Sequence, residues 1–176
     1  MSDEKLNERA PGIKILVLDV DGVLTAGNII LDNAGVEYKA FHVRDGHGIK
    51  MLQRAGVKVA IITGRSSAVV DARAAELGID EVRQGAREKL PVFEELVGRL
   101  GFTDEEAAYV GDDIVDLPVM RRAGLSFAVA DAEPYVRDAA DVVTERKGGQ
   151  GAVREVIDLL LRASGRWDEV TAKYFG

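Results

Sequence analysis

Residues 13–25 read IKILVLDVDGVLT, an apolar run that ends abruptly in Asp19, Asp21 and Gly22. A continuous β-branched run predicts a strand that is buried on both faces, as in a parallel sheet. Residues i and i+2 of an extended chain point to the same face, so we expect the two carboxylates to lie together. Like charges 4 Å apart cost roughly 4 kcal/mol at an effective dielectric constant of 20, which a divalent cation can offset. Alone, the stretch also fits a strand that runs into an Asp-Gly turn.

The composition indicates one acidic globular domain. The chain has 176 residues, of which 47% are hydrophobic, and a formal net charge of −7. With no long basic run, we expect no nucleic-acid partner. The absence of cysteine excludes disulfides and thiolate metal sites. No apolar run approaches the ~20 residues that span a bilayer, so we expect no membrane partner and a cytoplasmic location.

Strand-like and helix-like segments alternate along the chain. After the first strand we expect strands over 57–63, 81–83, 107–110, 126–130 and 141–144, and helices over 48–55, 67–77, 89–100, 116–123, 134–139 and 152–163. This alternation predicts an α/β fold, a Rossmann-like three-layer α/β/α arrangement around a parallel sheet. The domain should span residues 13–165, between a flexible N-terminal lead (1–12) and a C-terminal tail (166–176) without clear periodicity.

An insertion over residues 27–43 has the pattern of a β-hairpin. Two short β-like runs, 28–31 and 36–43, flank the turn residues DNAG. An isolated hairpin is marginally stable in water, and alternation can bury only one of its faces against its own domain. We therefore expect the hairpin to join copies of the chain; the alternative is a monomer whose hairpin rests on its own sheet. The apolar residues that we expect to be exposed are Ile29, Ile30, Leu31, Val36 and Phe41.

Polar residues follow four of the predicted strands. Because ligands of parallel sheets bind beyond the carboxyl ends of the strands, we expect these residues to form one site. In chain order they are Asp19 and Asp21, Thr63 to Arg65, Lys89, and Asp112 with Asp113.

These side chains suit phosphoryl transfer, which needs mainly positioning and charge neutralisation. Asp19 can attack phosphorus to form an aspartyl-phosphate, and Asp21 can protonate the leaving oxygen and later activate water. Thr63 and Lys89 can bind the phosphoryl oxygens, while Asp19 and Asp112 can hold Mg²⁺. Taken singly, each residue also has a structural explanation, such as a turn at Thr63, a solvated lysine or a favourably charged helix start.

As a set, DVDGVLT (19–25), ITGR (62–65), Lys89 and GDDIVD (111–116) resemble the four motifs of the haloacid dehalogenase superfamily of phosphohydrolases. The resemblance implies that Asp19 is the nucleophile and Asp21 the acid and base. It also implies that Thr63 and Lys89 bind phosphate. The implied ligands of Mg²⁺ are Asp19, the backbone carbonyl of Asp21, and Asp112, with Asp113 and Asp116 as supporting acids.

A narrower resemblance concerns the substrate. The stretches FHVRDGHGIK (41–50), DLP (116–118), FAVADA (127–132) and GGQGAVRE (148–155) are similar to the family of 3-deoxy-D-manno-octulosonate 8-phosphate phosphatases. This implies a capless homotetramer whose hairpins form a barrel, with a neighbour closing each site, and a role in lipopolysaccharide precursor biosynthesis. The substrate contacts that it implies are His42, Val43, Arg44, Asp45, Gly46, Lys50, Arg65 and Arg73. At Lys50 relatives often have arginine.

The sequence also contains further candidate site residues, and two alternative functions remain open. Gly64 and Arg154 are additional candidates for substrate contact, and residues 148–151 for a flexible lid. One alternative is a phosphatase for a nine-carbon sialic-type acid phosphate. Such relatives tend to have an acidic residue where this chain has Arg65. The other alternative, a catalytically silent regulator or scaffold on the same fold, is disfavoured by the intact set of motif residues.

Overall fold

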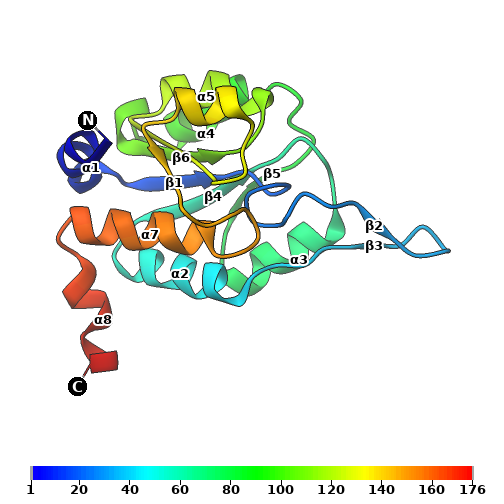
Figure 1. Ribbon diagram of the computed structural model, residues 1–176, viewed down its shortest axis with the longest axis horizontal. Coiled ribbons are helices and arrows are strands. Elements are labelled where there is room, and N and C mark those ends of the chain that lie inside the picture. Colours follow the sequence, from blue (N-terminus) through cyan, green and yellow to red (C-terminus); the bar gives the residue numbers. More distant parts are fainter. Residues whose placement is uncertain (1, 176) are drawn as a thin grey trace.

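The computed structural model describes residues 2–175, which form three layers around a six-stranded parallel sheet (Figure 1). The order of the strands in the sheet is β5-β4-β1-β6-β7-β8. The strands are β1 (Ile15–Leu18), β4 (Lys58–Ile62), β5 (Glu81–Arg83), β6 (Ala107–Gly111), β7 (Leu125–Ala128) and β8 (Val142–Val143). The α/β fold predicted from the sequence is confirmed.

Helices cover both faces of this sheet. In Figure 1, α2, α3 and α7 lie on one side of it, and α4 and α5 lie on the other. The short helix α6 packs beside α5. These helices are α2 (Val43–Arg54), α3 (Ala68–Leu77), α4 (Lys89–Arg99), α5 (Leu117–Arg122), α6 (Pro134–Ala139) and α7 (Ala152–Ala163), and 3₁₀ turns lie at Asp104–Glu106 and Ile114–Asp116.

Strand β1 lies in the middle of the sheet, and this placement positions the site. Its four residues are buried, as expected for an apolar run covered on both faces. Leu18 pairs with Ile61 of β4 on one side and with Val110 of β6 on the other. The residue that follows, Asp19, therefore emerges between the carboxyl ends of two neighbouring strands.

Helix α2 begins at Val43, five residues before the predicted start. Glycine lowers helix propensity by about 1 kcal/mol, so Gly46 and Gly48 conceal this first turn in the sequence. Tertiary packing explains why they are there. A Cβ at Gly46 would lie 2.4 Å from Arg73 Nη2, and one at Gly48 would lie 2.9 Å from Arg154 Cδ.

The N-terminal lead, which we expected to be flexible, instead forms helix α1 (Ser2–Arg9) and a 3₁₀ turn at Ala10–Gly12. Leu6 and Ala10 are buried in the hydrophobic core. Lys5 Nζ lies 2.5 Å from Asp141 Oδ1, which joins this helix to the residue before β8. Because the N-terminal lead is mostly charged and polar, its sequence did not indicate these few anchoring contacts.

The C-terminal segment also differs from the expectation. It forms helix α8 (Trp167–Phe175), in which Val170 and Thr171 are buried. Met1 and Gly176, the outermost residues of the predicted lead and tail, lie outside the described residues. Among residues 2–175, no helix has the length and apolar character needed to cross a membrane.

The predicted hairpin is present, but its strands are only two residues long: β2 (Ile30–Leu31) and β3 (Glu37–Tyr38), paired antiparallel. Asp32 Oδ1 closes the turn by accepting hydrogen bonds from the backbone N–H groups of Ala34 (2.8 Å) and Val36 (2.9 Å). The hairpin projects beyond the end of the sheet (Figure 1).

The apolar side chains of the hairpin divide into two groups. Ile29 and Leu31 are 65% and 58% exposed, as expected. Phe41 is not: it is partly buried against the core, and the Arg73 guanidinium lies 5.7 Å from its ring centroid. The expectation that Phe41 is exposed is therefore wrong, because the chain has already returned to the domain at this residue.

Candidate active site

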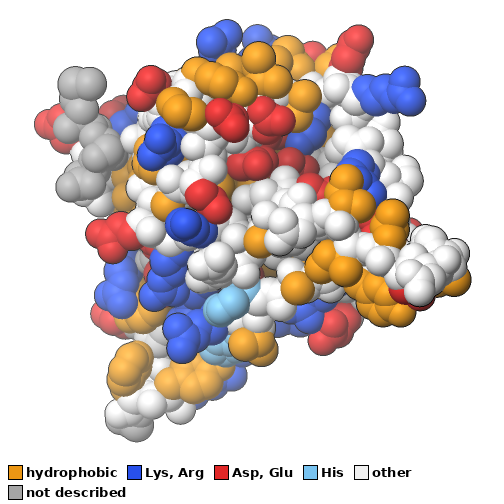
Figure 2. Space-filling model, turned by 45° about the vertical axis from the view of Figure 1, so that its right-hand side comes forward, with side chains coloured by type: hydrophobic (Ala, Val, Ile, Leu, Met, Phe, Trp, Pro, Cys, Tyr) orange, Lys and Arg blue, Asp and Glu red, His pale blue; other side chains and the backbone are white. Residues whose placement is uncertain are grey.

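A cleft of about 510 Å³ opens at the carboxyl ends of β1, β4 and β6. Figure 2 turns this end of the molecule forward and shows acidic side chains gathered beside a hollow. The lining residues are Asp19, Asp21, Gly27, Thr63, Gly64, Arg65, Ala86, Arg87, Lys89, Asp112, Asp113 and Val115. The four sequence motifs therefore meet in one place.

Lys89 lies between two carboxylates at the floor of the cleft. Its Nζ atom is 2.9 Å from Asp19 Oδ2 and 2.7 Å from Asp116 Oδ1. All three side chains are buried, since Asp19 is 5% exposed, Lys89 3% and Asp116 0%. The start of α4 thus carries a desolvated positive charge to the candidate nucleophile.

Asp116 accepts several further hydrogen bonds at the floor of the cleft. Its Oδ1 also accepts a hydrogen bond from the Tyr109 hydroxyl at 2.6 Å. Its Oδ2 accepts from the backbone N–H groups of Asp112 (3.0 Å) and Asp113 (3.2 Å). With Lys89, each oxygen of Asp116 has two partners, so this residue supports the loop after β6 and is not a surface charge.

Asp19 and Asp112 have the character of a site for a hard cation. Carboxylate oxygens of Asp19, Asp112 and Asp116 lie within 4.8 Å of one another. Within the described part of the chain, Asp112 Oδ1 is buried without a hydrogen-bond partner, whereas both oxygens of Asp116 are already occupied. Carboxylate oxygens are ligands that fit Mg²⁺. Those that remain available to a cation belong to Asp19 and Asp112.

The pKa values of the two carboxylic acids in the protein without a cation are raised, first by burial and then by neighbouring negative charge. Burial raises the pKa of Asp19 to about 6, although Lys89 opposes the change. Burial, followed by the charges of Asp19 and Asp116, raises the pKa of Asp112 to about 8. Burial disfavours the ammonium of Lys89, but Asp19 and Asp116 outweigh it and raise the pKa of this lysine. A bound divalent cation would favour both carboxylates as anions.

Glycine is required where the loop after β1 passes Asp112. Gly22 has φ +92°, and a Cβ there would lie 1.9 Å from Asp112 Oδ2. The loop before α7 packs on the same turn: a Cβ at Gly148 would lie 1.7 Å from the Gly22 carbonyl oxygen, and Gly149 N–H donates to Val23 O at 2.9 Å. Gly148 and Gly149 thus pack as a support on the turn after β1, and the flexible lid over residues 148–151 stays a prediction.

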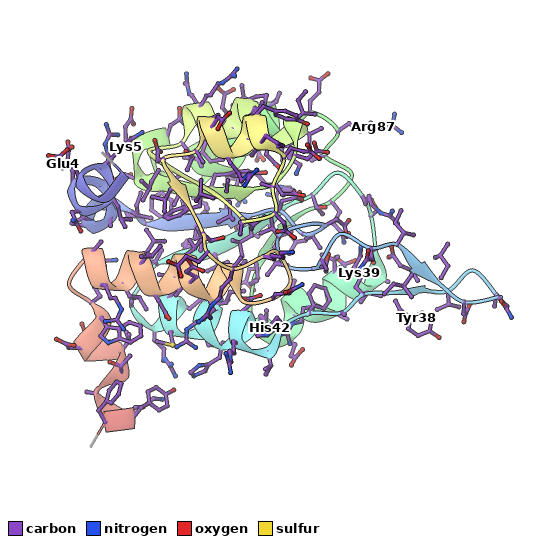
Figure 3. All side chains as sticks on the ribbon, in the orientation of Figure 1. Glu4, Lys5, Tyr38, Lys39, His42 and Arg87 are labelled. Atoms are coloured by element: carbon purple, nitrogen blue, oxygen red, sulfur yellow. The ribbon has the colours of Figure 1, made fainter. Side chains whose placement is uncertain are left out.

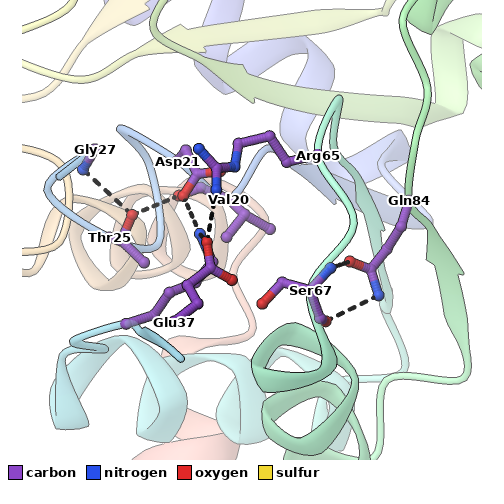
Figure 4. A network of polar contacts seen from close by, with 9 residues as sticks. Val20, Asp21, Thr25, Gly27, Glu37, Arg65, Ser67 and Gln84 are labelled. Atoms are coloured by element: carbon purple, nitrogen blue, oxygen red, sulfur yellow. Dashed lines mark hydrogen bonds and ion pairs between the residues drawn. The ribbon is translucent and has the colours of Figure 1, made fainter. Parts of the chain in front are cut away.

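Asp21 contacts residues of the hairpin. Its Oδ1 lies 2.5 Å from Lys39 Nζ, and its Oδ2 lies 3.8 Å from Arg65 Nε. Glu37 Oε1 accepts a hydrogen bond from Arg65 Nη2 at 2.7 Å and lies 3.5 Å from Lys39 Nζ. Figure 4 shows Asp21, Glu37 and Arg65 converging beside the turn after β1. We call Asp21, Glu37, Lys39 and Arg65 the ion cluster.

The loop after β4 presents Thr63 to the cleft. Thr63 is 2% exposed. Its backbone N–H donates to Arg83 O at 2.9 Å, and its carbonyl accepts from Ala86 N–H at 3.0 Å. Further along, Ser67 N–H donates to Gln84 Oε1 at 2.7 Å (Figure 4). These bonds hold the segment that contains Gly64 and Arg65 against the loop after β5.

Of the substrate contacts expected from the sequence, only Gly64 and Arg65 line the cleft. Arg154 Nε instead lies 2.7 Å from Asp158 Oδ1, and its Nη1 lies 3.3 Å from His47 Nδ1. Arg73 Nη1 lies 2.7 Å from Glu76 Oε2. The remaining expected contacts, absent from the cleft lining of this chain, are His42, Val43, Arg44, Asp45, Gly46 and Lys50.

Asp45 and Lys50 illustrate why these residues do not reach the cleft. Asp45 is 1% exposed, and its Oδ1 accepts the backbone N–H of Arg154 at 2.8 Å, which ties α2 to the start of α7. Burial raises the pKa of Asp45. Lys50 Nζ lies near Gly78 at the end of α3, 3.3 Å from where a Cβ would be built. Both side chains make contacts between helices.

Sequence reasoning missed four residues of the site. Lys39 and Glu37 were concealed within a hairpin assigned to assembly, and Tyr109 within an apolar strand. Arg87 lines the cleft two residues before Lys89. A polar side chain within a strand of otherwise apolar residues, as at Tyr109, was the one available signal, because such hydroxyls usually have a buried partner.

The chain matches known proteins along most of its length. A family model for haloacid dehalogenase-like hydrolase matches residues 46–124. The 3-deoxy-D-manno-octulosonate 8-phosphate phosphatase of Escherichia coli K12 is 52% identical over 161 residues, which cover 92% of this chain and 86% of that protein.

Solved structures are similar as well. That of the phosphatase of the same name from Moraxella catarrhalis, in complex with magnesium ion, phosphate ion and KDO, has a TM-score of 0.95 and 43% identity, covering 97% of this chain and 98% of the other. A cobalt-bound form of the Haemophilus influenzae phosphatase has a TM-score of 0.90 and 46% identity, with 95% and 98% of the two chains covered.

Proposed function

Because the chain belongs to the family of 3-deoxy-D-manno-octulosonate 8-phosphate phosphatases, among the haloacid dehalogenase-like hydrolases, we propose that it hydrolyses this sugar acid phosphate to the free sugar acid and inorganic phosphate. The protein is a phosphoric monoester hydrolase that works with Mg²⁺. The observation that carries the proposal is the meeting of Asp19, Thr63, Lys89 and Asp112 in one cleft.

We propose the following roles, which the placement of these groups supports. An oxygen of Asp19 attacks phosphorus, and the P–O bond to the sugar breaks as the aspartyl-phosphate forms. Lys89 and Thr63 bind the phosphoryl oxygens, and Lys89 also holds Asp19 in place at 2.9 Å. Asp21 gives a proton to the leaving sugar oxygen and then takes one from the water that hydrolyses the aspartyl-phosphate.

Asp19, the backbone carbonyl of Asp21, and Asp112 would hold the cation, supported by Asp113 and Asp116. When bound, Mg²⁺ neutralises the charge that the phosphate dianion brings to these carboxylates. The buried Asp112 Oδ1, which has no hydrogen-bond partner among residues 2–175, supports this assignment.

The active unit that we infer is a homotetramer built through the hairpin. Two observations support it: the hairpin exposes Ile29 and Leu31, and eight of the ten expected substrate contacts lie outside the cleft of their own chain. His42, Val43 and Arg44 at the start of α2 adjoin the hairpin and are not buried, so a neighbouring copy can bring such residues to this cleft. The cytoplasmic location stays a prediction.

A phosphate-release assay tests the function. The panel contains the eight-carbon sugar acid 8-phosphate, a nine-carbon sialic-type acid 9-phosphate and a neutral sugar phosphate, each with Mg²⁺ or with excess chelator. We expect the highest kcat/KM for the eight-carbon substrate and no turnover in chelator. Preference for the nine-carbon acid would replace the substrate, and release from none of them would favour a catalytically silent protein.

A further inference from the structure

We propose that Lys39 is a positioning residue for Asp21 and that it couples the hairpin to proton transfer in the cleft. The inference rests on the proposed function, in which Asp21 is the acid and the base. It gives the hairpin a part in the chemistry of its own chain, in addition to any part in assembly.

The burial of Lys39 is the first observation. The residue directly follows β3 in a hairpin whose side chains are mostly exposed, yet its own side chain is only 3% exposed. Its neighbour Tyr38 is 53% exposed. Figure 3 labels both residues near the base of the hairpin. Lysine is almost never buried unless it is paired, so the hairpin withdraws this ammonium from water for a specific partner.

That partner is Asp21. Lys39 Nζ lies 2.5 Å from Asp21 Oδ1, close enough for a charge-assisted hydrogen bond. The other oxygen, Oδ2, lies 3.8 Å from Arg65 Nε and faces the side of the cleft that Arg65 lines. Lys39 therefore holds one oxygen of the carboxylate and leaves the second for proton transfer.

Glu37 completes the connection. It lies between Lys39 Nζ, at 3.5 Å, and Arg65 Nη2, at 2.7 Å, and so keeps the two cations of the ion cluster apart. Glu37 belongs to β3, and Arg65 belongs to the loop after β4. The orientation of Asp21 is consequently determined by the place of the hairpin relative to the sheet. Misplacing a catalytic group by about 1 Å can cost 10²-fold in rate.

A purely structural role for Lys39 makes a different prediction from a positioning role. Loss of a structural ion pair would slow every substrate by a similar factor. Loss of positioning would slow substrates in proportion to their need for a proton. In the first step the ester oxygen leaves with the bonding electron pair and takes the proton of Asp21, so a good leaving group needs this proton least.

The experiment measures that dependence with Mg²⁺-loaded enzyme and a series of aryl phosphates. Stopped-flow detection of the phenol released in the first turnover isolates the phosphorylation of Asp19 from later hydrolysis. For Lys39→Met we expect a loss of ~10²-fold with phenyl phosphate and a much smaller loss with 2,4-dinitrophenyl phosphate. Lys39→Arg should restore most of the rate. Lys58→Met, which alters an exposed lysine at the opposite end of β4, is the matched control.

Equal losses across the series, or no loss, would overturn the inference. Circular dichroism checks that each variant is folded, and Lys39→Gln, with the same expected leaving-group dependence, replaces Lys39→Met if the latter does not fold. The sugar acid phosphate is assayed in parallel. If wild-type enzyme does not hydrolyse it but the aryl series behaves as expected, the proposed substrate fails and the positioning role stands. If the wild-type enzyme hydrolyses the sugar acid phosphate but Lys39→Met shows no leaving-group dependence, the proposed substrate stands and only the positioning role of Lys39 is rejected.

Discussion

Replacing Asp116 with alanine should remove the support beneath the whole phosphate site. The side chain is fully buried and accepts hydrogen bonds from Lys89, from the Tyr109 hydroxyl and from the backbone N–H groups of Asp112 and Asp113. The variant leaves these donors without their acceptor. It also leaves Lys89 with Asp19 as its one remaining carboxylate partner within ion-pair distance among the described residues.

The expected magnitude follows from these contacts. Breaking a buried ion pair by removing one partner costs about 3–5 kcal/mol in free energy of unfolding. The remaining contact between Lys89 and Asp19 favours the lower end of that range. For a chain of this size, each kcal/mol corresponds to ~2–4 °C in Tm, so we expect the melting temperature to fall by roughly 6–20 °C. Tyr109→Phe removes only one of the donors and should cost about 1 kcal/mol.

Urea unfolding at one fixed protein concentration measures these differences. Asp138→Ala, at an exposed position on α6, serves as the control and should change the free energy of unfolding by less than ~0.5 kcal/mol. The turnover number of Asp116→Ala should also fall, by ~10–100-fold, because the loop that carries Asp112 loses its anchor. If Asp116→Ala destabilises the protein no more than Asp138→Ala, the reasoning about the buried floor is refuted.

Three further predictions concern chemistry, pH and assembly. Asp19→Asn should abolish phosphate release and covalent labelling of the protein by substrate phosphate, because an amide is a poor nucleophile; normal turnover would exclude an aspartyl-phosphate at this residue. The raised pKa values of Asp19 (about 6) and Asp112 (about 8) favour protonation in the folded state, so metal-free protein should lose stability as pH rises toward 8. Mg²⁺ should therefore raise the Tm more at pH 8 than at pH 6, and Asp112→Asn should reduce that difference; an equal effect of Mg²⁺ at both pH values would contradict this. Ile29→Asp with Leu31→Asp should give a smaller species in sedimentation and lower turnover, and a folded monomer of wild-type activity would show that the partner contributes nothing.

The sequence allowed the central sheet to be predicted because its strands are covered on both faces. Apolar runs such as 13–18 and 57–62 are then recognisable without knowledge of their neighbours. The termini were not predictable, since a few buried residues such as Leu6 and Val170 anchor otherwise polar helices. The start of α2 was missed because Gly46 serves close helix packing, which overrides its low helix propensity.

Part of the candidate site could likewise be predicted from the sequence, and part could not. Residues that directly follow a strand, such as Asp19 and Thr63, could be located from strand ends alone. The support beneath them could not, because Tyr109 contacts Asp116 through the turn after β6 and not through any periodic pattern. Lys39 was missed because hairpin lysines are normally solvated, and only the fold shows that this one is withdrawn toward Asp21.

The packing of Gly148 and Gly149 against the turn after β1 also has a meaning for protein synthesis. Ribosomes add roughly 5–20 residues per second, so the segment 19–25 exists for several seconds before the residues that support it have been made. During that time β1 also lacks its partner β6. A nascent chain therefore contains the whole first motif before the active site can form. Messages truncated before residue 148 should yield products that cannot hydrolyse the substrate.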